Sequence, residues 1–254
     1  MDRLKGFFTS GSNTSQIVIV LIIGSVLFGV IYGIMTKIMN NMKNKRNNPL
    51  LIKGVHDGSK PLHFTQDLKE SNAVPILRSK NEDDGMEFTY SYWFVVNDMN
   101  YKFGEWKHLF HKGNKTSWPN RAPGVWLHPE KNSLRVYMNV YEDVIDYIDI
   151  ENIPINKWVH MAVVLRNTFL DIYINGDLVK RHELKGIAKQ NFNDLYICNF
   201  GGFSGYLSRF KYNNHALEPK EIRSLSKNIP SISELDTTPK EGPPYLSYRW
   251  DETQ

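Results

Sequence analysis

The first forty residues and the rest of the chain differ in how apolar positions are arranged. Ile17 to Met35 is a run of nineteen residues without a charge, a proline or an amide side chain. As a helix this run would reach roughly 28 Å, about the thickness of a bilayer's hydrocarbon core. A helix also satisfies its own backbone hydrogen bonds, as a lone segment in lipid must. The pattern therefore predicts a transmembrane helix over 17–37, after an N-terminal flank over 1–16.

A cleaved signal peptide is the alternative interpretation of the same run. Such peptides have a shorter apolar core followed by small residues at a cleavage site. Here the core is longer, no alanine precedes Ala73, and Lys37 and the sequence NNMKNKRNN follow. We therefore expect an uncleaved anchor, joined by a solvated linker over 38–60 to the rest of the chain.

Basic residues beside the apolar run predict its orientation. Arg3 and Lys5, partly offset by Asp2, precede it, and four basic residues follow it: Lys37, Lys43, Lys45 and Arg46. Positive flanks stay cytoplasmic, so the larger part of the chain is expected on the cytosolic side. The single cysteine, Cys198, agrees, because it leaves no internal disulfide.

Small residues recur every four positions within the apolar run, at Ser25, Gly29 and Gly33. A face of this kind lets two membrane helices approach closely. The spacing predicts that this face pairs with a second helix.

Beyond the linker, apolar positions alternate with polar ones in short runs. The first run alternates through Phe88, Tyr90, Tyr92, Phe94 and Val96, a period of two that is typical of a half-buried strand. Aromatic and β-branched residues dominate the later runs as well. These runs cover 106–110, 124–127, 134–140, 144–150, 158–165, 169–174, 195–198 and 206–212.

Turn residues separate these runs. Asn175-Gly176 stands between two alternating runs, as in a hairpin with a type I′ turn. Many short strands at this spacing indicate a sandwich or a barrel. A short helix is expected over 219–225, with Pro219 at its start.

Several of these segments resemble, in the right order, the laminin-G-like, concanavalin A-like jelly roll. The resemblance implies two antiparallel sheets packed face to face over 61–225, with Trp158 in the core and His160 as a packed structural histidine. It rests on FTYSYWF at 88–94, LFHKG at 109–113, NKWVHMAVV at 156–164, the hairpin at 170–179, FSGYLSRF at 203–210 and the segment 213–222. The fold class is thus an all-β jelly-roll sandwich preceded by one transmembrane α-helix.

Charge excludes one class of partner. Residues 1–46 carry six Lys/Arg and one acid, whereas the other 208 residues carry 25 Lys/Arg and 26 Asp/Glu. The domain is therefore balanced in charge, and a nucleic-acid binder needs a concentrated basic face. The basic cluster beside the apolar run suits anionic lipid headgroups instead.

Catalytic and metal-binding motifs are weak. Glycanases of the wider fold place carboxylates at alternate positions of one strand; here Asp149 and Glu151 alternate, but position 147 is Tyr. His108 and His111 lack a third ligand at metal-site spacing. We therefore predict no enzyme, no metal and no cofactor. Calcium stays open through loop acids that match no family motif: Asp143, Asp146 and Asp194.

Aromatic residues supply the binding candidates. Trp118 lies in the polar segment NKTSWPNR and is expected to be exposed as a contact for sugar or protein. Trp126, Tyr137 and Tyr141 are further candidates on the domain. The segment 226–254 is expected to be an extended tail that contacts the domain or a neighbour through three aromatics: Tyr245, Tyr248 and Trp250.

The leading interpretation is a single-pass, membrane-anchored, non-enzymatic binding or scaffold protein. A lone N-terminal anchor before such a domain resembles virion proteins of large DNA viruses, which implies a minor structural role between capsid proteins and an internal membrane. The alternative is a lectin-like receptor that binds glycans on a lumenal or extracellular face. A glycanase is the remote alternative.

Overall fold

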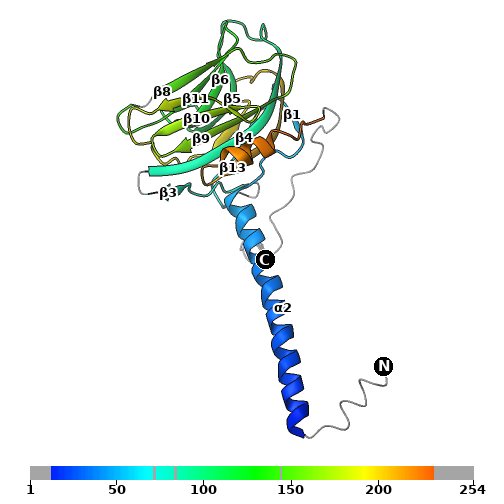
Figure 1. Ribbon diagram of the computed structural model, residues 1–254. Coiled ribbons are helices and arrows are strands. Elements are labelled where there is room, and N and C mark those ends of the chain that lie inside the picture. The colour runs from blue at the N-terminus through cyan, green and yellow to red at the C-terminus, as the bar shows by residue number, and fades with distance from the viewer. Residues whose placement is uncertain (1–12, 71–72, 83–84, 144, 232–254) are drawn as a thin grey trace. The chain divides into compact units, whose positions relative to one another are not determined.

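The computed structural model describes residues 13–70, 73–82, 85–143 and 145–231 (Figure 1). Two compact units divide the chain, Met1–Arg46 and Asn47–Gln254. The helix α2 fills the described part of the first unit, and the strands lie in the second.

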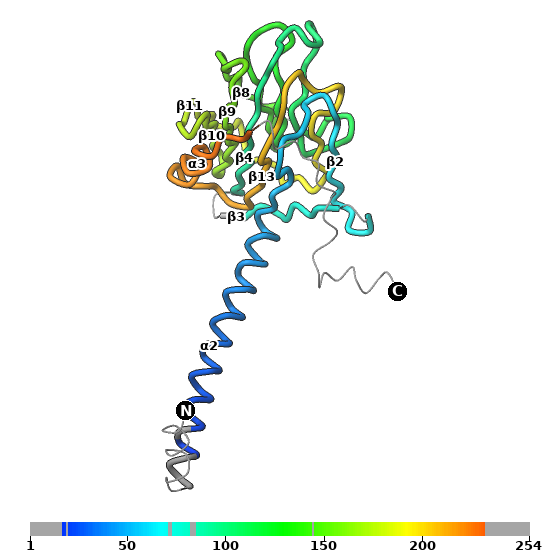
Figure 2. The backbone as a smooth tube through the Cα atoms, turned by 90° about the vertical axis from the view of Figure 1, so that its right-hand side faces the viewer, coloured from blue at the N-terminus to red at the C-terminus, as the bar shows by residue number. Residues whose placement is uncertain are grey.

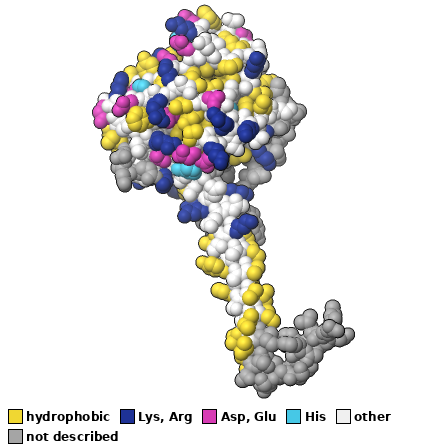
Figure 3. Space-filling view, in the orientation of Figure 1, with side chains coloured by type: hydrophobic (Ala, Val, Ile, Leu, Met, Phe, Trp, Pro, Cys, Tyr) yellow, Lys and Arg dark blue, Asp and Glu magenta, His cyan; other side chains and the backbone are white. Residues whose placement is uncertain are grey.

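Helix α2 spans Asn13–Asn47. Its apolar side chains are exposed along its length, and Lys45 and Arg46 lie in its last turn (Figure 3). Val20–Asn47 is long and apolar enough to cross a membrane by length and composition. The helix is thus longer than the predicted span of 17–37, and residues 38–47 continue it where a solvated linker was expected. No proline interrupts it before Pro49.

The second unit is a sandwich of two antiparallel sheets, which confirms the predicted fold class. The first sheet contains β1 (Val55–Asp57), β13 (Ser204–Asn213), β4 (Gly85–Asp98), β9 (Val159–Arg166), β10 (Phe169–Ile174) and β11 (Asp177–Glu183), with β3 (Lys80–Glu82) paired to β4. The second sheet contains β2 (Leu62–Phe64), β12 (Leu195–Ile197), β5 (Lys107–Gly113), β6 (Arg121–Leu127), β7 (Ser133–Met138) and β8 (Asp146–Glu151). In Figure 1, β4, β9, β10 and β11 run side by side as one layer.

Alternating side chains fill the space between the sheets. The predicted inward positions of β4, from Phe88 to Val96, are all buried in the core. Tyr92 and Phe210 stack at 5.2 Å, and Phe110 meets Phe210 edge to face at 4.8 Å. Burying a ring of this size contributes about 1.5–3 kcal/mol, so this aromatic cluster is a main source of the sandwich's stability.

Strand β7 shows which side chains face outward from the second sheet. Leu134, Val136 and Met138 belong to the core. Successive side chains of a strand point to opposite faces, so Arg135 and Tyr137 lie on the outer face. This outer face carries the candidate site described below.

The predicted hairpin and helix are both confirmed. Asn175 and Gly176 have positive φ angles of 54° and 92° between β10 and β11. Helix α3 spans Pro219–Leu225 behind a capping box of Glu218 and Glu221. It packs Ile222 onto the outer face of the first sheet, and Figure 2 shows β2, of the second sheet, on the side away from α3. Helix α3 therefore packs on the first sheet and not on the second.

Two sequence-based expectations differ from the structure. Residues 49–58 belong to the sandwich and not to a linker, since Leu51 N donates to Phe210 O at 2.7 Å and Val55 pairs with Ser208. Ile52 is only 2% exposed. Trp158, expected in the core, is half-buried just before β9. The predicted tail contacts Tyr245, Tyr248 and Trp250 lie outside the described residues.

Candidate functional site

The outer face of the second sheet carries one ring on each of its six strands, which we call the aromatic row. Neighbouring rings lie 4.6–5.8 Å apart between centroids, so the row is continuous across the sheet. At the β2 end the rings stack face to face, with 7° between the first two planes. The row consists of His63, Tyr196, His111, Trp126, Tyr137 and Tyr147.

Gly124 makes room for the widest ring of the row. A Cβ atom at this position would lie 2.4 Å from Cζ3 of Trp126. The indole therefore lies over the backbone of its own strand. In this position it reaches both His111, at 5.8 Å, and Tyr137, at 5.4 Å.

Two guanidinium groups lie on the row. Arg121 Cζ is 3.8 Å from the centroid of the Tyr137 ring and 5.5 Å from that of Trp126. Arg135 Cζ is 3.9 Å from the centroid of Tyr147. Each cation is thus stacked on a ring, an arrangement favourable by about 0.5–2 kcal/mol.

The two arginines differ in their partners. Arg135 donates to both carboxylate oxygens of Asp149, at 2.6 and 2.7 Å, and this hydrogen bonding raises the pKa of Arg135. Arg121 has no carboxylate partner among the residues that the structure describes, and its Nε is buried without a hydrogen-bond partner. Burial lowers the pKa of Arg121. Arg121 is therefore a half-buried cation without a counter-ion in the described chain.

Trp118 extends the row into solvent. Its side chain is 54% exposed, and its ring centroid lies 5.6 Å from Arg121 Cζ. The loop that carries it is braced by hydrogen bonds. Asn114 Nδ2 donates to Trp118 O at 3.0 Å, and Asn139 Nδ2 donates to Pro119 O at 3.0 Å. The indole is therefore presented on a loop that is already ordered.

A chain of hydrogen bonds links His111 of the row to the neighbouring His108 and assigns the tautomers of both. Asn199 N–H donates to His108 Nδ1 at 2.9 Å, so the proton of His108 is on Nε2. This Nε2 lies 2.7 Å from His111 Nδ1, and His111 Nε2 then donates to Asn114 O at 2.8 Å. Burial lowers the pKa of His108 well below its usual value and that of His111 to about 4.

The structure brings together three of the four aromatic candidates on the domain. Trp118, Trp126 and Tyr137 all surround Arg121. Tyr141 instead lies beside Lys189, whose Nζ is 5.4 Å from its ring. Their roles in binding stay predictions. His111 was considered in the sequence only as a metal ligand and Tyr147 only as a departure from the glycanase pattern. The two arginines, His63 and Tyr196 were not proposed as site residues.

The acidic candidates hold structural positions. Asp146 is buried and accepts from His182 Nε2 and Lys185 N. Asp143 accepts from Lys185 Nζ, and Asp194 accepts from His63 Nε2. In the described ranges, no three His, Cys, Asp or Glu residues gather as a metal site would require.

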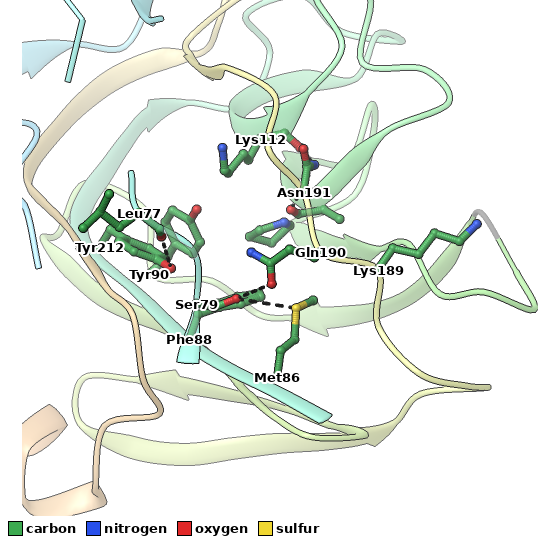
Figure 4. Close-up of a pocket in the computed structure, with 12 residues that line it drawn as sticks. Leu77, Ser79, Met86, Phe88, Tyr90, Lys112, Lys189, Gln190, Asn191 and Tyr212 are labelled. Carbon is green, nitrogen blue, oxygen red and sulfur yellow. Dashed lines mark hydrogen bonds between the residues drawn. The ribbon is translucent and has the colours of Figure 1, made fainter. Parts of the chain in front are cut away.

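A cavity between Met86, Tyr90 and Gln190 is too small for a sugar. It measures about 20 Å³, close to the size of one water. Figure 4 shows Lys112, Asn191 and Gln190 pointing toward it, with Ser79 Oγ 2.7 Å from Gln190 Oε1. Burial lowers the pKa of Lys112 to about 8. This cavity therefore has no room for a sugar, whereas the Trp118 ring beside the row is exposed to solvent.

The matching family model is the concanavalin A-like lectin/glucanases superfamily, over residues 68–223. The chain belongs to this family, and its two-sheet jelly roll is the architecture expected from the sequence resemblance. A comparison with curated proteins finds no match.

Solved structures show the same fold. The botulinum neurotoxin serotype D ligand-binding domain in complex with N-acetylneuraminic acid is 10% identical, with a TM-score of 0.52 over 73% of this chain and 52% of that one. The receptor-binding domain of botulinum neurotoxin D is also 10% identical, with a TM-score of 0.50 over 72% of this chain and 53% of that one. The chain thus spans about half the length of these two structures, and the likeness concerns the fold.

Proposed function

We propose that this protein is a membrane-anchored, non-catalytic carbohydrate-binding protein. The binding site is the region around Trp118, Arg121 and Tyr137 on the aromatic row. One observation carries the proposal: an exposed indole on a braced loop stands beside a stacked arginine without a counter-ion. Aromatic faces with a few placed polar groups are typical of ligand sites. The family, which includes lectins, and the sialic acid complex of one structural neighbour support the same choice.

The site lacks features that glycoside hydrolysis would use. Asp149 is paired through both oxygens with Arg135, and Tyr147 occupies the alternate position where the glycanase pattern places a carboxylate. A general acid and a nucleophile would have to flank the scissile bond. We therefore propose binding without turnover and retain glycanase activity as the remote alternative.

Helix α2 supplies the proposed anchor. Its apolar length suits a bilayer, and basic residues from Lys37 to Arg46 follow the apolar run. The cytosolic orientation stays a prediction from these flanking charges. Protease digestion of sealed microsomal vesicles tests this orientation. A cytosolic domain lies outside these vesicles and would be digested, whereas a lumenal domain would be protected.

The scaffold role also stays a prediction. It combines the family fold with a single anchor and a tail over 226–254, and its narrower form is a minor capsid protein that ties a virion membrane to the shell. Cross-linking in the native membrane or particle would identify the protein neighbour. A capsid protein as the main adduct would support this role over carbohydrate binding.

Replacing the exposed indole tests the proposed site. We expect Trp118→Ala to weaken saccharide binding at least tenfold, about 1.4 kcal/mol, because the variant removes the solvent-facing stacking surface. The side chain is exposed, so the unfolding temperature should stay nearly unchanged. Binding is measured on a glycan array and then by titration, with the full chain in lipid nanodiscs.

Phe169→Ala is the matched control, since Phe169 is an exposed aromatic on β10 of the other sheet. It should leave saccharide binding unchanged. An array on which wild type binds nothing, or a Trp118→Ala variant that binds like wild type, would refute the proposed site.

A further inference from the structure

We infer that the saccharide carries a carboxylate, which Arg121 binds through its guanidinium group. This inference rests on the proposed function and specifies the class of its ligand. The exposed Trp118 indole by itself would suit neutral and acidic sugars alike. The choice between them depends on the one arginine of the row without a partner in the described chain.

The neighbouring arginine shows what such a complex looks like. Arg135 stacks on Tyr147 at 3.9 Å and is paired with the carboxylate of Asp149 through two hydrogen bonds. A ring below and a carboxylate at the edge together satisfy the planar guanidinium group. This triad of ring, arginine and carboxylate lies on the same sheet face as Arg121.

Arg121 repeats this arrangement without its acid. Its distance from the Tyr137 ring, 3.8 Å, matches the 3.9 Å between Arg135 and Tyr147. The strands β7 and β8 place Tyr137 and Tyr147 directly opposite each other, so the two stacked arginines are adjacent repeats of one motif. A ligand carboxylate at the edge of Arg121 would complete the second repeat.

The charge of the row concentrates at Arg121. His108 and His111 are neutral at pH 7, because burial lowers the pKa of both. Asp149 neutralises Arg135, and His63 pairs with Asp194. Among the described members of the row and their partners, Arg121 is thus the cation that lacks compensation. A half-buried charge of this kind gains more from an anion than a fully solvated one does.

The adjacent indole decides in favour of a sugar over a free anion. Trp118 lies on the solvent side of Arg121, with its ring 5.6 Å from the guanidinium carbon. A carboxylate on a sugar ring would let one ligand use both groups. A carboxylate matches the planar guanidinium fork through two parallel bonds, and a sulfate ester offers a tetrahedral alternative.

Matched acidic and neutral saccharides test the inference. The probes are 3′-sialyllactose and trigalacturonate, each beside its carboxyl-reduced form, and a sulfated lactose. Affinities are measured by titration of the full chain in nanodiscs of neutral lipid. For at least one pair, wild type should bind the carboxylate form at least tenfold more tightly than the reduced form. Added salt should reduce the difference in affinity between the acidic and the reduced form.

Variants separate this inference from the proposed function. Arg121→Gln should bind the acid and its reduced form equally, and Arg121→Lys should recover only part of the preference, because an ammonium group lacks the planar fork. Trp118→Ala should weaken both forms. Arg223→Gln, on α3, removes one exposed arginine elsewhere and should leave the affinity for both forms unchanged.

Each outcome decides a separate claim. Wild type could bind both members of every pair with equal affinity, and Arg121→Gln could bind them as wild type does. This result would overturn the claim that Arg121 binds a ligand carboxylate and would leave the proposal of carbohydrate binding intact. Tight binding of the sulfated probe alone would overturn the carboxylate and indicate that Arg121 binds a sulfate ester. Binding of no probe in either form would overturn both claims.

Discussion

Lowering the pH from 7 to 5 is expected to destabilise the sandwich steeply. Three buried histidines carry this prediction: His108, His111 and His160. Burial lowers the pKa of His111 and of His160 to about 4, and lowers that of His108 in the same direction. In the unfolded chain a histidine titrates near 6.5.

Stability falls with falling pH because the unfolded state takes up more protons than the folded state. Above pH 6.5 both states are neutral at these positions, and the full stability is present. Between pH 6.5 and 4 the unfolded chain binds protons that the folded chain excludes. Each histidine then removes about 1.4 kcal/mol per pH unit. Between pH 6.5 and 5, His111 and His160 together cost about 4 kcal/mol, a large fraction of the total stability of many domains.

In the folded state, an additional N–H on His111 or His160 would find no hydrogen-bond acceptor. His111 already accepts at Nδ1 and donates from Nε2. His160 packs edge to face against Trp93 at 5.3 Å, and its Nδ1 is buried without a hydrogen-bond partner. Protonation would therefore place an uncompensated charge inside the domain.

Thermal unfolding of the full chain in nanodiscs at pH 7, 6 and 5 measures the effect, with near-ultraviolet circular dichroism as the signal. His160→Phe should reduce the pH dependence by about a third, since it removes one of the three protons. His56→Gln, on strand β1 with a side chain outside the core, should leave the pH dependence unchanged. Equal unfolding temperatures at pH 7 and 5 in wild type would contradict the prediction.

Two charges in the middle of α2 should abolish membrane anchoring. We expect Leu27→Arg/Val30→Arg to convert the protein from carbonate-resistant to carbonate-extractable. An arginine at the centre of a membrane helix costs about 2.5–3.5 kcal/mol, so the pair costs about 5–7 kcal/mol. Both side chains are exposed in the helix, and neither is part of the small-residue face at Ser25, Gly29 and Gly33.

Cell-free translation with membrane vesicles, followed by carbonate extraction, reads out anchoring. Leu27→Ala/Val30→Ala is the control, because it keeps the helix uncharged and should stay in the membrane pellet. An arginine variant that pellets like wild type would show that α2 is not the anchor. The intact mass of wild type separates an anchor from a cleaved signal, since a cleaved chain would lack the start of the 254-residue sequence.

Local patterns predicted most of the sandwich. The alternation from Phe88 to Val96 located β4, Asn175-Gly176 located the hairpin of β10 and β11, and Pro219 located α3. These signals are local because strand alternation, positive φ angles and helix capping each depend on a few neighbouring residues. The strands β1, β2 and β3 were missed, since their three residues are not an apolar run as the three residues of β12 are. The strands β1 and β2 form through pairing with β13 and β12, more than a hundred residues away.

The candidate site was predicted only in part for the same reason. Trp118 was singled out by its polar surroundings, and the structure confirms its exposure. The grouping of Arg121 with Tyr137 depends on the pairing of β6 with β7, which no local pattern encodes. The outward period of β7, Arg135 and then Tyr137, was a usable signal, because the intervening residues are aliphatic core positions.

The position of a bound saccharide tests the central claim most directly. A crystal structure of the full chain with an acidic oligosaccharide that it binds should show the sugar ring against Trp118. The carboxylate should lie at the edge of the Arg121 guanidinium group, which remains stacked on Tyr137. A saccharide bound over the first sheet or along the edge strand β11, with Arg121 untouched, would contradict the account.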